Sequence, residues 1–228
     1  IKKSDTDLQA EMGALLDPGT AEDTIRDRSE MLLAVDDGLG EILDELTRLN
    51  ILDNTMVVFT SDNGYFYGEQ GLSVERRLAY EEGIRVPLLV RYPKLVEAGS
   101  RPNQFALSID IAPTMLEMAN ATIKSSIQGR SLVNVLEGTE DEWRDKFLVE
   151  YTSYEQPMTW LVNSSYKAIR TEEYKYIHWV HHQDADELYD LVNDPYELVN
   201  LVNHPDYQSE GQQLRDDLSA LIAEAFGL

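Results

Sequence analysis

The spacing of apolar residues changes along the chain, and each pattern predicts a different element. Between Ile25 and about Asn50 they recur at helical spacing, which predicts a long amphipathic helix with one face on a core. The continuous apolar run 55–60 is typical of a strand buried on both faces, as in a parallel sheet. Residues 86–93 predict a second buried strand, and residues 108–118 a helix with proline in its first turn. This order of elements indicates an α/β layered domain.

After about Trp143 the pattern becomes that of a smaller sheet. Four short segments rich in aromatic and β-branched residues predict antiparallel strands, at 147–152, 167–170, 174–180 and 187–191. A closing helix is predicted over 208–226. We therefore expect an α/β fold in two parts. Residues 1–145 would be the C-terminal portion of a large mixed-sheet domain, and residues 146–228 an α+β unit with a four-stranded antiparallel sheet and a terminal helix.

The charge of the chain is acidic but uneven. Its 228 residues include 42 Asp and Glu against 19 Lys and Arg, a net charge of −23, and no Cys, which excludes disulfides and cysteine nucleophiles. Such a charge argues against nucleic acids and anionic membrane surfaces as partners, and no apolar run reaches the roughly 20 residues of a membrane span. Residues 76–101 are nevertheless basic. An anionic ligand would bind there, although local salt bridges explain the island equally well.

Asp62 and Asn63 follow the first predicted strand at its carboxyl end, where open α/β sheets bind ligands. A carboxylate and an amide oxygen are hard ligands that suit Ca²⁺ or Mg²⁺. Asp-Asn-Gly is also a favoured turn, and spacing alone favours the turn.

Several motifs follow one another in a fixed order along the chain. They are Ala34–Leu43, Leu52–Gly64, Tyr80-Glu81-Glu82 with Arg85-Val86-Pro87, Ile109–Thr114, Gly129–Leu132, Ile169-Arg170-Thr171, Tyr174–Ile177, Glu187–Leu191 and Asn193-Asp194-Pro195. This series resembles the sulfatase family of the alkaline-phosphatase-like superfamily, over nearly the whole chain beyond about residue 25. The resemblance implies the C-terminal half of such an enzyme.

The resemblance also implies roles for individual residues in the metal and sulfate loop, residues 61–87. Asp62 and Asn63 match the pair that binds the divalent cation, usually calcium. Arg76 stands where the family places a sulfate-contacting Lys, with Arg77 as the alternative, and its planar donors can grip two sulfate oxygens. Gln70 lies where many relatives carry His, so it is a candidate for contacting the substrate. The competing interpretation pairs both arginines with Glu75, Glu81 or Glu82.

The family's nucleophile motif is missing from this sequence. Sulfatases use a formylglycine made from the Cys or Ser of a Cys/Ser-x-Pro-x-Arg motif, and the nearest match, Ser100–Gln104, ends in Gln. The first metal-binding Asp pair and the catalytic Lys and His of the family belong to a part that would precede Ile1. We therefore expect this chain to be inactive by itself.

The parent protein would hydrolyse sulfate esters of a carbohydrate or small molecule, in the periplasm or after secretion. The alternatives are a phosphodiesterase or phosphonate hydrolase of the same superfamily, and a non-catalytic fragment or binding module. The sequence predicts no oligomeric state.

Two further groups of residues have both a structural and a functional interpretation. His181 and His182, with Asp184 and Asp186, can suggest a transition-metal site, but their position between two predicted strands favours a hairpin loop. Tryptophans can stack on sugar rings, but buried aromatic packing explains them as easily. These are Trp143, Trp160 and Trp179.

Overall fold

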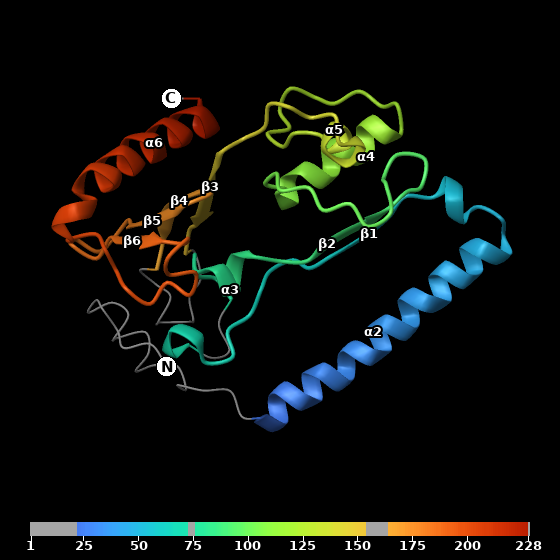
Figure 1. Ribbon diagram of the computed structural model, residues 1–228, viewed down its shortest axis with the longest axis horizontal. Coiled ribbons are helices and arrows are strands. Elements are labelled where there is room, and N and C mark those ends of the chain that lie inside the picture. Colours follow the sequence, from blue (N-terminus) through green and yellow to red (C-terminus); the bar gives the residue numbers. More distant parts are fainter. Residues whose placement is uncertain (1–21, 73–75, 154–163, 228) are drawn as a thin grey trace. The chain divides into compact units, whose positions relative to one another are not determined.

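The computed structural model describes residues 22–72, 76–153 and 164–227 (Figure 1). By their contacts these residues form two units. The ribbon unit consists of residues 22–62 and 86–144, and the sheet unit of the described residues in 63–85 and 145–228. The division predicted at residue 145 stays a prediction, but the segment 63–85 groups by contacts with the C-terminal residues.

Each unit has its own set of helices and strands. The ribbon unit contains α2 (Glu22–Arg48), β1 (Val57–Thr60), β2 (Leu88–Arg91), α4 (Ile111–Met118) and α5 (Val133–Glu137). The sheet unit contains α3 (Glu81–Ile84), β3 (Lys146–Tyr151), β4 (Tyr166–Thr171), β5 (Tyr174–Trp179), β6 (Glu187–Asp190) and α6 (Gln208–Phe226).

The sheet unit is built on a four-stranded antiparallel sheet in the order β3-β4-β5-β6. In its register, Ile169 lies opposite Tyr176, and Tyr176 opposite Leu188. These three residues share one face, where they pack against Leu214 and Leu218 of α6. Figure 1 shows α6 along the sheet. The predicted four strands and terminal helix are confirmed.

The opposite face of this sheet is covered by the segment 63–85. Alternate residues of the strands, among them Ile177 and Trp179, point to this side and pack with Phe66, Leu78 and Tyr80. Because side chains alternate between the faces of a strand, each strand contributes to both cores. The segment that contains Arg76 and Arg77 is therefore part of the packing of the C-terminal sheet.

The ribbon unit has a two-stranded antiparallel sheet with one covered face. Val58 lies opposite Val90, and both line a small apolar pocket together with Met115 of α4 and Leu136 of α5. On the other face, Leu89 is 59% exposed. The strand predicted at 55–60 is confirmed as β1, Val57–Thr60. Its predicted burial on both faces in a parallel sheet is wrong for the described residues, because it pairs antiparallel and helices cover only one of its faces.

The helix α2 confirms the predicted helical pattern but not its predicted packing. None of its residues is buried, and Met31, Leu32 and Leu33 are each more than 60% exposed. An ion pair between Arg48 and Glu45, at 2.6 Å, supports its last turn. The expectation of one face on a core is thus wrong for the described part of the chain. No helix in that part is long and apolar enough to span a membrane.

Two of the sequence motifs meet around the buried carboxylate of Asp110. It accepts hydrogen bonds from the backbone N–H of Leu107 and Arg130, both at 2.8 Å, and forms an ion pair with Arg144. A Cβ atom at Gly129 would lie 2.0 Å from the backbone oxygen of Ile109. These contacts explain the motifs 109–114 and 129–132 by packing.

Gly64 fixes the start of the segment 63–85 against α3. Its N–H donates to the backbone oxygen of Gly83 at 2.9 Å, and a Cβ atom at Gly64 would lie only 1.9 Å from the backbone oxygen of Glu82. The two backbones approach so closely that only glycine fits.

We predict that Gly64→Ala destabilises the protein by about 2 kcal/mol, because backbone must move to admit the methyl group. The measurement is the urea unfolding midpoint. The matched control is Gly40→Ala in α2, where nothing lies within 4 Å of the added Cβ. That change is expected to stabilise the helix by about 1 kcal/mol. Equal midpoints for Gly64→Ala and the wild type would contradict the close approach.

Candidate functional site

The predicted metal residues follow β1 directly. The side chain of Asp62 is exposed, and Ser61 Oγ lies 3.4 Å from its Oδ1. Asn63 is half-buried, and its Nδ2 donates to the backbone oxygen of Gly64 at 2.8 Å. The oxygen of the Asn63 amide is the atom that could bind a cation, because hard cations take oxygen ligands. A carboxylate and an amide oxygen fit a hard cation such as Ca²⁺.

Asp62 and Asn63 would supply only part of a coordination shell. Calcium takes six to eight oxygen ligands. Within residues 22–72, 76–153 and 164–227, no group of three or more His, Cys, Asp or Glu side chains is placed to hold a metal ion. The metal assignment of Asp62 and Asn63 therefore remains a prediction.

Arg76 and Arg77 lie directly before a buried apolar anchor. Leu78, Ala79 and Tyr80 insert into the core on the sheet, whereas Arg76 is exposed and Arg77 half-buried. The anchor thus fixes the backbone next to both cations while leaving Arg76 at the surface.

Tyr80 is tied to a carboxylate in the middle of the sheet. Its hydroxyl lies 2.9 Å and 3.1 Å from the two oxygens of Glu187, which is fully buried. Trp179 Nε1 and the Tyr189 hydroxyl donate to the same carboxylate. Burial, with Tyr80 and Glu187 close by, raises the pKa of Tyr189 well above its ordinary value, so that hydroxyl remains a donor.

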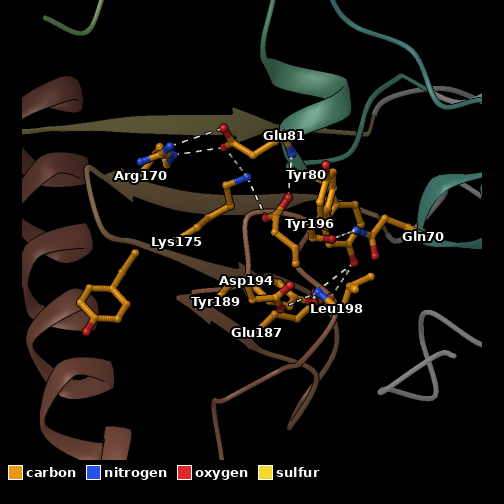
Figure 2. Close-up of polar contacts among 12 residues, drawn as sticks. Gln70, Tyr80, Glu81, Arg170, Lys175, Glu187, Tyr189, Asp194, Tyr196 and Leu198 are labelled. Carbon is orange, nitrogen blue, oxygen red and sulfur yellow. Dashed lines mark hydrogen bonds and ion pairs between the residues drawn. The ribbon is translucent and has the colours of Figure 1, made fainter. Parts of the chain in front are cut away.

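Glu81, the next residue, joins a buried ion network. Its Oε1 lies 2.8 Å from Lys175 Nζ and 3.1 Å from Arg170 Nε. Lys175 Nζ also lies 2.8 Å from Glu197 Oε1, and both of those side chains are fully buried (Figure 2). Burial would raise the pKa of Glu81, but Lys175 and Arg170 outweigh it and lower that pKa. Burial raises the pKa of Glu197, with Lys175 opposing the rise.

The sequence alone does not predict this network. Lys175 and Asp194 lie in the motifs 174–177 and 193–195, yet Lys175 is one polar residue in an aromatic strand. The available signal was its position: it shares a face with Ile177 and Trp179, which are buried. A lysine on a buried face requires a carboxylate partner. Glu81, one of the three acidic residues in the competing interpretation of Arg76 and Arg77, contacts Lys175 and Arg170. Another, Glu75, lies outside the described residues.

Gln70 contacts the C-terminal part of the sheet unit. Its Nε2 donates to the backbone oxygen of Tyr196 at 2.8 Å, and its backbone has φ = 56° within the short 3₁₀ turn Glu69–Gly71. The side-chain nitrogen therefore holds a loop of the protein. A role of Gln70 in contacting the substrate stays a prediction.

The remaining candidates have structural explanations. Residues 181–186 form the turn between β5 and β6, which confirms the predicted hairpin loop. Trp143 donates to the backbone oxygen of Phe105 at 2.6 Å, and Trp179 is buried. Trp160 lies outside the described residues.

Comparison with known families gives two matches. The sulfatase family matches residues 3–121, and the family described as "N-sulphoglucosamine sulphohydrolase, C-terminal" matches residues 68–224. Together they cover the motifs from the first helix to α6.

Individual relatives agree with these families. The N-acetylglucosamine-6-O-sulfatase of Bacteroides thetaiotaomicron is 39% identical over 193 residues, which are 83% of this chain and 34% of that protein. A structure solved in complex with its substrate, D-glucosamine-2-N,6-O-disulfate, has a TM-score of 0.78 and 37% identity over 86% of this chain and 39% of its own.

A phosphonate monoester hydrolase of Agrobacterium radiobacter is also similar, with a TM-score of 0.75 and 28% identity over 86% of this chain and 40% of its own. The chain thus spans well under half the length of each of these relatives. By the two family matches and the likeness of its fold, the chain belongs to the sulfatase family of the alkaline-phosphatase-like superfamily and corresponds to its C-terminal portion.

Proposed function

We propose that this chain is part of a sulfuric ester hydrolase that acts on a sulfated amino sugar. The observation that carries the proposal is the construction of the segment 63–85. Its start is docked on α3 through Gly64, and Arg76 lies at the surface just before the buried anchor that leads into α3. The similarity to an N-acetylglucosamine-6-O-sulfatase and to a structure bound to a glucosamine disulfate supports the substrate class.

In this proposal Arg76 binds the sulfate group. Its planar guanidinium can donate two parallel hydrogen bonds to two sulfate oxygens, and its charge offsets the charge that those oxygens keep during ester cleavage. The family has Lys at this position, so the longer, forked side chain would hold the sulfate in a more defined orientation. Arg77 is the alternative for the same role, and Gln70 is a second candidate for contacting the substrate.

Asp62 and Asn63 would bind a divalent cation, Ca²⁺ or else Mg²⁺. Their carboxylate and amide oxygens are the donors that these hard cations prefer, and further ligands would have to come from other residues. A bound cation would withdraw negative charge from the sulfate oxygens.

The chain by itself would bind but not turn over a sulfate ester. Its sequence holds no Cys/Ser-x-Pro-x-Arg motif, from which the formylglycine nucleophile of sulfatases is made. We therefore assign the complete reaction to a longer protein that includes this chain. A periplasmic or secreted location remains a prediction by family resemblance.

A phosphonate or phosphodiester hydrolase is the second candidate, favoured by the likeness to a phosphonate monoester hydrolase. The complete protein would be assayed side by side with glucosamine 6-sulfate and with phenyl phenylphosphonate. A higher kcat/KM for the sulfate ester supports the sulfatase, and the reverse order supports the alternative. A protein that binds both without turnover would be a binding module.

The metal assignment predicts that Asp62→Ala and Asn63→Ala each weaken Ca²⁺ binding by the complete protein at least tenfold, since each removes one oxygen ligand. Isothermal titration calorimetry with Ca²⁺ measures the change. Asp141→Ala, which removes an exposed carboxylate from a loop of the ribbon unit, serves as the control for charge alone. The same affinity in all three variants would remove Asp62 and Asn63 from the metal site.

The sulfate assignment predicts that Arg76→Ala lowers kcat/KM of the complete protein for glucosamine 6-sulfate about 100-fold, whereas Arg76→Lys, which keeps the charge but loses the paired contact, lowers it less. Arg77→Ala is expected to change kcat/KM less than tenfold. Steady-state kinetics of the three variants measures these effects. A larger loss for Arg77→Ala than for Arg76→Ala would transfer the role to Arg77.

A further inference from the structure

Two consecutive residues near the C-terminus hold the candidate sulfate-binding segment at both ends. Tyr196 and Glu197 lie in the turn 194–199, which follows β6. One contacts Gln70 and the other contacts Glu81. Arg76 and Arg77 lie between those two points in the sequence. Figure 2 shows both contacts converging on the same turn.

The first contact is a hydrogen bond between side chain and backbone. Gln70 Nε2 donates to the backbone oxygen of Tyr196 at 2.8 Å. Gln70 is also held at φ = 56°, a left-handed conformation that residues other than glycine seldom adopt. Such a conformation persists where surrounding contacts determine it, and this bond is one of them.

The second contact is charged and buried. Glu197 Oε2 accepts the backbone N–H of Glu81 at 2.8 Å, while its Oε1 pairs with Lys175 at the same distance. Lys175 in turn pairs with Glu81 Oε1, so Glu81 is held through both its backbone and its side chain. With Arg170 the cluster has two basic and two acidic side chains.

Hydrogen bonds within the turn 194–199 stabilise it. Asp194 Oδ2 accepts the backbone N–H groups of Leu198, at 2.6 Å, and Val199, at 2.8 Å. The backbone N–H of Glu197 donates to the backbone oxygen of Asp194 at 3.1 Å, and Glu197 has φ = 53°. The turn thus presents the Tyr196 carbonyl and the Glu197 carboxylate in a fixed geometry.

We infer that the turn 194–199, together with Lys175, is a positioning device for the sulfate-binding arginine. The inference rests on the proposed role of Arg76. The turn holds the segment at Gln70 and at Glu81, on either side of Arg76 in the sequence, and so supports the buried anchor beside which Arg76 lies. Buried ion pairs give little net stability over well-packed apolar residues, but they require one defined arrangement of their partners. A displacement of about 1 Å in such an arrangement can lower a rate about 100-fold.

The test replaces the buried pair by apolar residues of similar size, Lys175→Met with Glu197→Leu. One cation and one anion are removed together, and Glu81 keeps Arg170. The matched control makes the same two changes in the ion pair of Lys167 and Glu150, on β4 and β3 of the same sheet, where Glu150 is exposed.

The first readout is backbone hydrogen exchange in the 228-residue chain. The buried double variant is expected to exchange at least tenfold faster at the amides of Glu81–Arg85, with less than a threefold change in β4 and β5, while the control pair changes neither. Unchanged exchange at Glu81–Arg85 would overturn the inference. So would an equal acceleration throughout the sheet, since the pair would then support only the fold.

The second readout is the kinetics of the complete protein with glucosamine 6-sulfate. We expect kcat/KM to fall about 100-fold in the buried double variant and less than twofold in the control pair. Wild-type kcat/KM in the buried variant would overturn the inference. If the wild-type protein does not hydrolyse the sulfate ester, the proposed function fails, whereas the exchange measurement still decides whether the turn holds the segment.

Discussion

The fold of the sheet unit depends on how it accommodates one fully buried lysine, Lys175. Lys175 points from β5 into the face of the sheet that the segment 63–85 covers, and its ammonium group is fully buried. Leaving such a charge without partners costs several kcal/mol, so the fold must bring carboxylates to it. Glu81 and Glu197 provide them from segments on either side of it in the sequence. Residues far apart in the chain are thereby required to meet at one point.

Different interactions therefore hold the two faces of the sheet. The face under α6 is held by apolar packing, as between Leu188 and Leu214, which fixes the helix only as closely as shape allows. The other face combines apolar packing with the carboxylates of Glu187 and Glu197, whose donors are specified atom by atom. Directional bonds of this kind lie under the segment where sulfate chemistry is proposed.

The sequence predicted those parts of the fold that depend on local patterns. Strands alternate with period two and α6 has a helical repeat, so β3–β6 and α6 were found close to their observed bounds. Partners distant in the chain were not found: β1 was given a parallel neighbour, and α2 a core that the described residues do not provide. For the site, motif order suggested roles for Asp62, Asn63 and Arg76, but it could not show that Lys175 and Glu197 hold Glu81, since neither residue carries a chemical signature of its own.

The exposed apolar stripe of α2 has a consequence for the behaviour of the chain in solution. Leu32, Val35 and Ile42 share one helix face and are exposed, so they offer a surface on which copies of the chain can adhere, while the net charge of −23 drives the copies apart. At low ionic strength the repulsion extends over tens of ångströms, and at 1 M salt over about 3 Å. Colloidal stability of the purified chain is thus a balance between one helix and the overall charge, and added salt moves that balance towards self-association.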